Sequence, residues 1–133
     1  MTGNCVLDAS ALVLALVGKV DGAEDLRLRL PTLHCHAPHL IDAEVGNVLR
    51  RHEQAGLIDT TEAATALRAS ESMIEYRYAH TGSLARHAWK WRANLTFYDA
   101  LYVALAARLG VPLLTADARL AHVPGLDCQI ELI

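Results

Sequence analysis

Short apolar runs alternate with longer amphipathic stretches along this chain of 133 residues. The apolar runs predict buried strands, and the alternating tail predicts an edge strand with one wet face. Helical spacing of apolar positions, bounded by cap and stop residues, predicts helices between them. The strands are expected over residues 5–7, 34–37, 111–114 and 128–133, and the helices over residues 10–17, 24–30, 38–54, 59–73, 83–91, 97–109 and 118–121. Residues 74–79 are ambiguous, although an extended segment is compatible with their pattern.

Strands that alternate with helices indicate an α/β fold, with a central parallel or mostly parallel sheet and helices on both faces. The length suits a single domain over residues 1–133. Several helix starts carry their own signals. Asp59 and Glu62 have the spacing of a capping box, Ser10 is a candidate cap for the first helix, and Pro38 suits a first helical turn.

Composition narrows the function classes. Of the residues, 53% are hydrophobic and only 5% aromatic, so the core is expected to be aliphatic. The net charge of −3 gives no global basic signature, which argues against uniform electrostatic capture of RNA and leaves a local basic patch open.

No apolar run approaches the roughly 18 residues that span a bilayer, and the start of the chain lacks the features of a signal peptide. We expect no membrane association.

The three cysteines, Cys5, Cys35 and Cys128, lie in or beside apolar segments and fit no zinc spacing. They are interpreted as buried free thiols, which favours a reducing, cytoplasmic setting.

Four acidic residues stand where predicted elements would bring them together. Asp8 and Asp117 each follow a buried strand, Glu44 borders the apolar stripe of a helix, and Asp99 opens an almost wholly apolar helix. The carboxyl ends of strands are where α/β folds bind ligands. Because four carboxylates in one crevice would repel each other, the pattern predicts a divalent cation there and hydrolysis as its use. Magnesium, with manganese as an alternative, suits such oxygen donors.

Each acid also has a purely structural interpretation. Asp8 could be a turn or helix-start acid, and Glu44 an exposed residue whose stem packs on the helix. Asp99 could complete a capping box with Thr96, and Asp117 could cap the short helix that follows it. Only their joint placement carries the metal hypothesis.

Two hydroxyls accompany the acids. Ser10 and Thr115 each lie two residues from an acid, where they could position a carboxylate or a water, or cap backbone N–H groups.

The sequence also resembles a known family, through four motifs that run almost the length of the chain. It is similar to the PIN domain ribonucleases, and most of all to VapC-type toxins of bacterial toxin–antitoxin pairs. The motifs are Val6-Leu7-Asp8-Ala9-Ser10-Ala11, Ala37-Pro38-x5-Glu44-x2-Asn47-Val48-Leu49, Tyr98-Asp99-Ala100-x-Tyr102-x-Ala104-x-Ala106 and Leu114-Thr115-Ala116-Asp117.

The resemblance implies a PIN-like three-layer α/β/α sandwich with a central parallel sheet, and a Mg²⁺- or Mn²⁺-dependent endoribonuclease. The family's catalytic acids fall on Asp8, Glu44, Asp99 and Asp117, with Thr115 as a polar neighbour. The metal is expected chiefly on Asp8, Asp99 and Asp117. The resemblance further implies a homodimer, a cognate antitoxin that covers the active-site groove, and structured RNA such as tRNA or rRNA as substrate. Residues 57–78 and the helix over residues 97–109 are candidate dimer surface.

Two other clusters suggest different chemistry. His34, His36 and His39 flank Cys35 and could suggest a zinc site, but on a strand Cys35 would face away from His34 and His36, and His39 would lie on the next element. Residues 86–92 mix bases with aromatics, and their bases Arg86, Lys90 and Arg92 are candidate RNA contacts. In the same segment Trp89 is expected to face inward, and Trp91 is undecided.

The sequence therefore leaves two function classes. The first is a metal-dependent endoribonuclease, a hydrolase whose metal-activated water cleaves RNA. The second is a non-catalytic α/β interaction or ligand-binding module in which the acids hold a structural cation. A receiver-type phospho-acceptor domain is a weaker third, because Asp8 has no acidic neighbour and the only lysines are Lys19 and Lys90.

Overall fold

A five-stranded parallel sheet forms the centre of the computed structural model, which describes residues 3–133. The strand order is β3-β2-β1-β4-β5, and every neighbouring pair is parallel. The strands are β1 (Gly3–Leu7), β2 (Leu33–Pro38), β3 (Tyr76–Tyr78), β4 (Leu113–Thr115) and β5 (Ile130–Leu132). The ambiguous residues 74–79 thus supply an edge strand.

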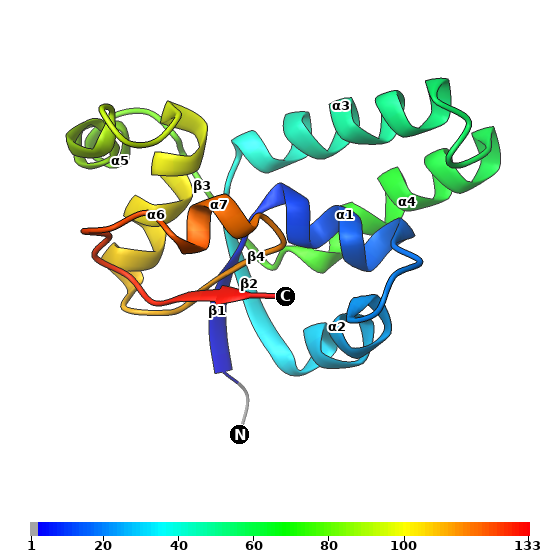
Figure 1. Ribbon diagram of the computed structural model, residues 1–133, viewed down its shortest axis with the longest axis horizontal. Coiled ribbons are helices and arrows are strands. Elements are labelled where there is room, and N and C mark those ends of the chain that lie inside the picture. The colour runs from blue at the N-terminus through cyan, green and yellow to red at the C-terminus, as the bar shows by residue number, and fades with distance from the viewer. Residues whose placement is uncertain (1–2) are drawn as a thin grey trace.

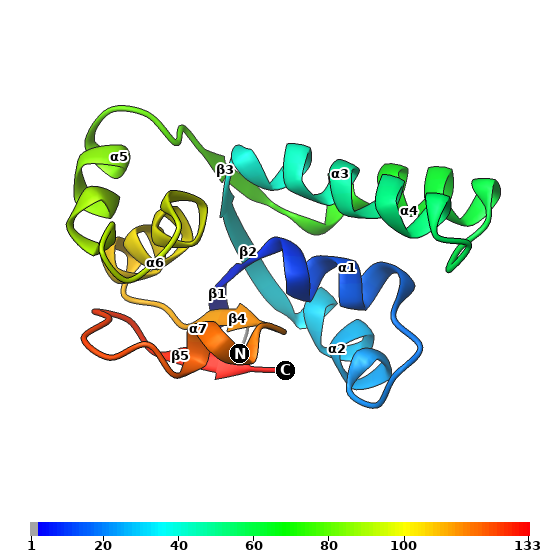
Figure 2. The same cartoon turned by 45° about the horizontal axis from the view of Figure 1, so that its top comes forward.

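Helices cover the sheet on both sides, as Figures 1 and 2 show. One layer holds α5 and α6, and the other holds α1, α2, α3 and α4. Their bounds are α1 (Ala9–Val17), α2 (Ala23–Arg29), α3 (Leu40–Gln54), α4 (Thr60–Met73), α5 (Ser83–Ala88) and α6 (Phe97–Leu109). The short α7 (Ala118–Ala121) follows β4 directly. The predicted three-layer α/β/α sandwich with a parallel sheet is confirmed.

The burial pattern explains why these segments form these layers. Strands β1 and β4 lie at the middle of the sheet, and Val6, Leu7, Leu113 and Leu114 are fully buried. Helix α6 packs over them, and every residue from Ala100 to Ala106 is buried. Its alternation of alanine with larger residues lets the helix lie close to the sheet, which agrees with the expected aliphatic core.

The helix caps match the sequence signals at α4, α6 and α7 and differ at α1 and α3. Asp59 and Glu62 form the predicted capping box, and Thr96 caps α6 by accepting a hydrogen bond from the Asp99 N–H at 3.1 Å. Ser10 is not the cap of α1, however, because Asp8 fills that role. Pro38 ends β2 and does not open α3, which begins at Leu40.

The segment around Trp89 also differs from its prediction. The helix expected over residues 83–91 ends at Ala88, and Trp89–Trp91 form a 3-10 turn. This tighter winding reverses the expected orientation, since Trp89 is 56% exposed and Trp91 is only 7% exposed. A 3-10 turn rotates side chains by about 120° per residue and an α-helix by about 100°, so inward positions shift along the segment.

The three thiols are free, and those of Cys5 and Cys35 are buried. These two residues are register partners on β1 and β2 and lie on the same face of the sheet. On the other face, the ring nitrogens of His36 contact the Tyr78 hydroxyl and the Asn4 side chain. Within residues 3–133, no helix combines the length and apolar character that crossing a bilayer requires.

The strand order places a topological switch point between β1 and β4. From β1 the chain extends the sheet through β2 to β3, and it later returns to add β4 and β5 on the opposite side. The helices that follow β1 and β4 therefore depart to different parts of the molecule, leaving a crevice at the carboxyl ends of these strands. Such crevices are the usual ligand sites of parallel α/β sheets.

Candidate active site

A cleft of about 790 Å³ opens at this switch point. All four predicted carboxylates line it, together with polar and cationic neighbours: Asp8, Ser10, Glu44, Asp99, Tyr102, Asp117 and Arg119. The other end lies between α1, α3 and the loop after α3. Its lining is mainly apolar, with three basic residues among them: Val13, Leu14, Val17, Val20, Val48, Leu57, Ile58, Lys19, Arg51 and His52. The acids thus share one wall of an elongated groove.

Asp8 is the deepest of the acids and is only 5% exposed. Its backbone N–H donates to Leu114 O at 3.2 Å, so the residue continues the β1–β4 pairing before the chain turns into α1. Its Oδ1 accepts the Ala11 N–H at 3.0 Å, which makes Asp8 the N-cap of that helix. The predicted structural role and a ligand role are compatible here, because capping engages only one carboxylate oxygen.

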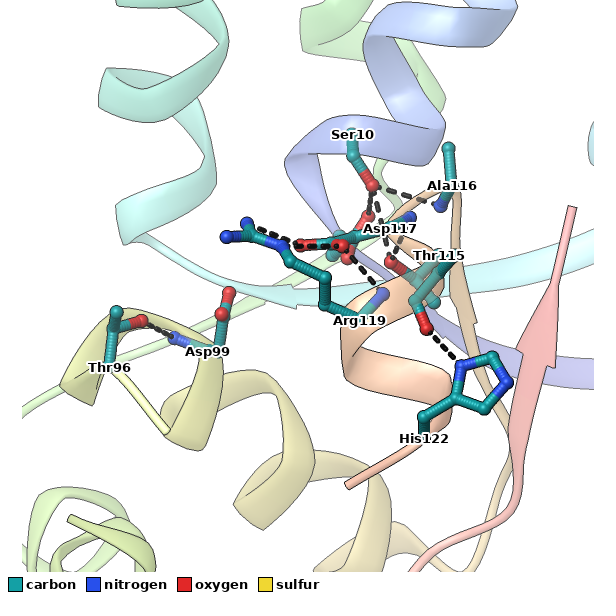
Figure 3. A network of polar contacts seen from close by, with 10 residues as sticks. Ser10, Thr96, Asp99, Thr115, Ala116, Asp117, Arg119 and His122 are labelled. Carbon is teal, nitrogen blue, oxygen red and sulfur yellow. Dashed lines mark hydrogen bonds and ion pairs between the residues drawn. The ribbon is translucent and has the colours of Figure 1, made fainter. Parts of the chain in front are cut away.

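Ser10 and Thr115 link β4 to the Asp8 carboxylate. The Ser10 hydroxyl donates to Asp8 Oδ1 at 2.6 Å. It also lies 3.2 Å from Thr115 Oγ1 (Figure 3). Ser10 Oγ also accepts the Ala116 N–H at 2.9 Å, and Thr115 Oγ1 accepts the Asp117 N–H at 3.0 Å. Ser10 thus contacts the carboxylate and also accepts a backbone N–H, so both of its suggested roles are compatible with the structure, and Thr115 is connected to Asp8 through Ser10.

Asp117 lies at the start of α7 and faces a cation. Its Oδ1 accepts the Arg119 N–H at 2.9 Å, the N-cap contact that the sequence suggested. The Arg119 guanidinium also binds the carboxylate, with Nε 3.2 Å from Oδ1 and Nη2 3.0 Å from Oδ2 (Figure 3). The Asp117 side chain is 27% exposed, whereas that of Arg119 is 89% exposed. The ion pair therefore sits at the lip of the cleft.

Asp99 and Glu44 approach from the two helical layers. Asp99 is in the first turn of α6, where the positive end of the helix favours a carboxylate. Glu44 on α3 is half-buried, and its Oε1 accepts the Tyr102 hydroxyl at 2.6 Å. Tyr102 is 1% exposed and follows Asp99 by one helical turn, so α6 presents a carboxylate and a phenol to the same cleft.

Burial and mutual repulsion set the electrostatics of the acids. Burial is the main cause that raises the pKa of Asp8, Glu44 and Asp99 above their usual values. Repulsion adds to it: the charge of Asp99 raises the pKa of Asp8 and Glu44, and that of Asp117 raises the pKa of Asp99. Asp117 is the exception, since its hydrogen bond with Arg119 lowers its pKa. The negative charges of Asp8, Glu44 and Asp99 are therefore unfavourable in the folded protein, and a bound cation would offset this repulsion.

The donor set fits a hard divalent cation. Every acid offers carboxylate oxygen, the ligand that Mg²⁺ and Mn²⁺ prefer. As placed, however, no three His, Cys, Asp or Glu side chains within residues 3–133 are close enough together to form a metal site. The shared cleft and the raised pKa values support cation binding, whereas a ligand sphere is not preformed.

The three candidate RNA contacts lie outside the lining of this cleft. Lys90 is ion-paired with Asp127, and its Nζ lies 4.4 Å from the Trp91 ring centre. Arg92 lies over the Trp89 ring, and Arg86 borders a shallow depression beside the same ring. The two arginines thus share an exposed aromatic surface.

Sequence reasoning gave no role to two residues that contact the acids of the cleft. Tyr102 was part of a recognised motif, but its hydroxyl contact with Glu44 joins residues 58 positions apart. Its spacing of three from Asp99, which puts the two side chains on the same side of the helix, was the available signal. Arg119 was signalled only by following Asp117 by two residues, a spacing that is equally common on solvated turns.

Comparison with known proteins gives a consistent picture. A family model for the PIN domain matches residues 5–126. The chain is 51% identical over 130 residues to Ribonuclease VapC1 of Mycobacterium tuberculosis, covering 98% of both chains.

Solved structures show the same fold. VapBC2 from Rickettsia felis, bound to a DNA fragment from its promoter, matches with a TM-score of 0.70 at 14% identity, covering 98% of both chains. The sarcin–ricin loop cleaving toxin VapC20 of M. tuberculosis matches with a TM-score of 0.70 at 14% identity, covering 94% of this chain and 98% of that chain. With its family match over most of the sequence and a relative at 51% identity, the chain belongs to the PIN domain family.

Proposed function

We propose that this protein is the endoribonuclease toxin of a type II toxin–antitoxin pair. It would cleave structured RNA, such as tRNA or rRNA, with Mg²⁺ or Mn²⁺ as cofactor. The observation that carries the proposal is the convergence of Asp8, Glu44, Asp99 and Asp117 on one cleft at the switch point of the sheet. The 51% identity to a protein named as a ribonuclease supports the same activity.

The acids would divide the work by their surroundings. Asp8, Asp99 and Asp117 would hold the cation, because they stand at the carboxyl ends of β1 and β4 and at the start of α6. Ser10 fixes one oxygen of Asp8, which leaves the other oxygen available to the cation. When bound, the metal would lower the pKa of a water and offset charge on the scissile phosphate.

Glu44 would act beside these three. The Tyr102 hydroxyl occupies its Oε1, so Oε2 remains to accept a proton or to orient the attacking water. The half-buried position and the raised pKa of Glu44 suit a group that exchanges protons. The positive end of α6 faces the same cleft and would favour the phosphate anion.

Binding of the RNA backbone would come from cations around the cleft. Arg86 and Arg92 would contact phosphates, which supplies affinity with little sequence information. Lys90 would contact a phosphate only if its ion pair with Asp127 were broken. Arg119, at the lip, is a further cation that a phosphate could draw away from Asp117.

The remaining assignments follow the same proposal. Residues 1–133 would act as a single domain in the cytoplasm, as a homodimer, and under control of a cognate antitoxin. The apolar end of the cleft suits such a partner. Of the two candidate dimer surfaces, helix α6 offers only its ends, because its central residues are buried. The exposed Leu57 and Leu67 leave the α3–α4 side as the candidate.

A cleavage assay tests the proposal. The purified protein should cut structured RNA with Mg²⁺ or Mn²⁺ and lose that activity in EDTA. Asp8→Asn, purified in parallel, should be inactive under every condition, which excludes a contaminating nuclease. Asp21→Asn is the matched control, since Asp21 is an exposed carboxylate outside the cleft. If the parent protein binds the cation and gains stability but never cuts RNA, a non-catalytic module with a structural cation is the better account.

A further inference from the structure

An exposed aromatic surface lies beside the active-site cleft, and the mechanism above gives its rings no role. We call Trp89, Phe97, Arg86 and Arg92 the aromatic platform. Trp89 is 56% exposed and Phe97 is 37% exposed, although both side chains are large and apolar. Their rings meet edge to face, with centres 6.1 Å apart and planes at 70°. This contact packs the indole against Phe97 while more than half of the Trp89 residue remains exposed.

Cations surround the ring. The Arg92 guanidinium carbon lies 5.2 Å from the centre of the Trp89 ring, and its Nη1 donates to Trp89 O at 3.0 Å. Arg86 joins Ala85, Trp89 and Phe97 in lining a shallow depression of about 380 Å³. Among the ion pairs within residues 3–133, none involves Arg86 or Arg92. Arg92 lies over one face of the Trp89 ring, so a base stacked on Trp89 would take the other face or displace Arg92. The platform therefore combines exposed aromatic rings with positive charge that is not ion-paired to a carboxylate.

The first turn of helix α6 carries residues of both the aromatic platform and the cleft. Phe97 is the first residue of α6 and Asp99 is the third, so the turn that carries the platform also carries a catalytic candidate. Residues two apart on a helix point to different sides, which places the platform on the flank of α6 and Asp99 in the cleft. A nucleic acid strand lying across the start of α6 would reach both.

We propose that the aromatic platform binds an unpaired nucleobase of the RNA substrate, stacked on Trp89, with Arg86 and Arg92 on the adjoining phosphates. This subsite rests on the proposed ribonuclease function. Aromatic side chains stack on any base, and flanking arginines add cation–π and phosphate contacts. The charge decides between RNA and protein as the occupant, because unneutralised arginines match a polyanion. Stacking requires an unpaired base, so the subsite selects loops and single-stranded segments.

Intrinsic fluorescence provides a direct test, because Trp89 and Trp91 are the only two tryptophans. The full chain is titrated in EDTA with a short unpaired RNA, so binding is read without cleavage. The RNA should quench the exposed Trp89, and Trp89→Phe, which keeps buried Trp91, should lose most of the quench. By fluorescence anisotropy of labelled RNA, Trp89→Ala should bind about tenfold more weakly. Trp89→Phe should stay within about threefold of the parent, because a stacking ring remains.

The control and the contrary outcomes are distinct. Tyr76→Ala removes an exposed aromatic from edge strand β3 and should leave RNA affinity unchanged. Equal affinity of Trp89→Ala and the parent overturns the platform, even if the parent cleaves RNA. Loss of self-association in Trp89→Ala with unchanged RNA affinity would identify a protein contact and overturn it as well. Conversely, Trp89-dependent binding by a protein that never cleaves would retain the subsite and refute the nuclease.

Discussion

The guanidinium of Arg119 lies against both carboxylate oxygens of Asp117, at 3.2 Å and 3.0 Å. The two residues are neighbours on α7, so the contact needs no long-range packing to form. It places a cation of the chain itself on an acid proposed to bind metal. An incoming divalent ion must therefore compete with Arg119 for Asp117, or bind the oxygen lone pairs that remain.

Removal of Arg119 should strengthen cation binding. In Arg119→Gln, Asp117 loses its cationic partner and the cleft becomes more negative, so the affinity for Mn²⁺ should rise severalfold by isothermal titration calorimetry. RNA affinity in EDTA should fall at the same time, because a cation at the lip is lost. Arg108→Gln is the control, since Arg108 contacts Ser83 away from the cleft. Unchanged or weaker Mn²⁺ binding in Arg119→Gln would mean that the pair helps to shape the metal site.

Replacement of Asp99 by its amide should separate stability from activity. Asp99→Asn removes a charge that burial and Asp117 penalise, while Thr96 still caps α6 through the backbone. Without metal, the variant should therefore melt at the parent's temperature or slightly above it, yet cut no RNA. A sharp drop in melting temperature would instead indicate a structural role for the Asp99 side chain.

The difference in stability between Asp99→Asn and the parent protein should depend on pH. The folded pKa of Asp99 is raised, so between its unfolded value of about 3.9 and the folded value the native state binds more protons than the unfolded state. The stability contribution of Asp99 consequently falls as pH rises through that window. The advantage of Asp99→Asn should be largest near neutral pH and vanish near pH 4. Thermal melts of both proteins between pH 4 and 8 would measure it, with Asp21→Asn as the control.

Loss of the Tyr102 hydroxyl should destabilise the protein. Tyr102→Phe preserves the buried ring but leaves Glu44 Oε1 without its donor. A hydrogen bond to a charged group contributes about 1.5–3 kcal/mol, so urea denaturation at pH 7.5 should show a loss of about that size. The same bond lowers the pKa of Glu44, and its loss should move the acidic limb of the pH–rate profile to higher pH. Tyr98→Phe, at an exposed position, should change neither quantity.

Self-association can be tested on the α3–α4 side. Leu67 on α4 is 48% exposed and Leu57 in the preceding loop is 61% exposed. If this side forms a twofold interface, Leu67→Arg should shift the protein from dimer to monomer in sedimentation velocity at micromolar concentration. The exposed Leu28 on α2 provides the control Leu28→Arg. A parent protein that sediments as a monomer would contradict the dimer itself.

Much of the fold could be predicted because its signals are local. Every α-helix and every strand except β3 lies within a few residues of a segment predicted from apolar period, cap or stop signals, whereas β3 lies in residues 74–79, whose pattern was ambiguous. The segment of β4 shows the limit. The apolar run begins at Val111, but the Val111 N–H bonds back to Ala106 O and Pro112 has no N–H, so β4 begins at Leu113.

In the candidate site too, the features with local signals could be predicted from the sequence and those that depend on long-range contacts could not. Strand ends placed Asp8 and Asp117 together, and the helix start placed Asp99, before any three-dimensional information. The partners that tune these acids depend on long-range contacts: Tyr102 reaches Glu44 across two layers, and Ser10 reaches Thr115 across the switch point. The failure at Trp89 has a different cause, because the change from α-helix to 3-10 turn after Ala88 altered which residues face inward.

The chemistry of the RNA ends should distinguish the two routes to cleavage. Water activated at the acidic cleft would attack the phosphorus in line and leave a 5′-phosphate and a 3′-hydroxyl. A histidine base acting on the RNA's own 2′-hydroxyl would instead leave a 2′,3′-cyclic phosphate and need no metal, and the chain has seven histidines. None of the seven lies among the acids at the cleft's polar end, and His52 lines only the apolar part. Mass spectrometry of the fragments should therefore find 5′-phosphates, and ligation of those ends to a 3′-hydroxyl acceptor should succeed without prior kinase treatment. Cyclic phosphate ends would contradict the metal mechanism. So would full activity of the parent protein in EDTA while Asp8→Asn stays inactive, because the protein's own acid–base groups would then catalyse cleavage.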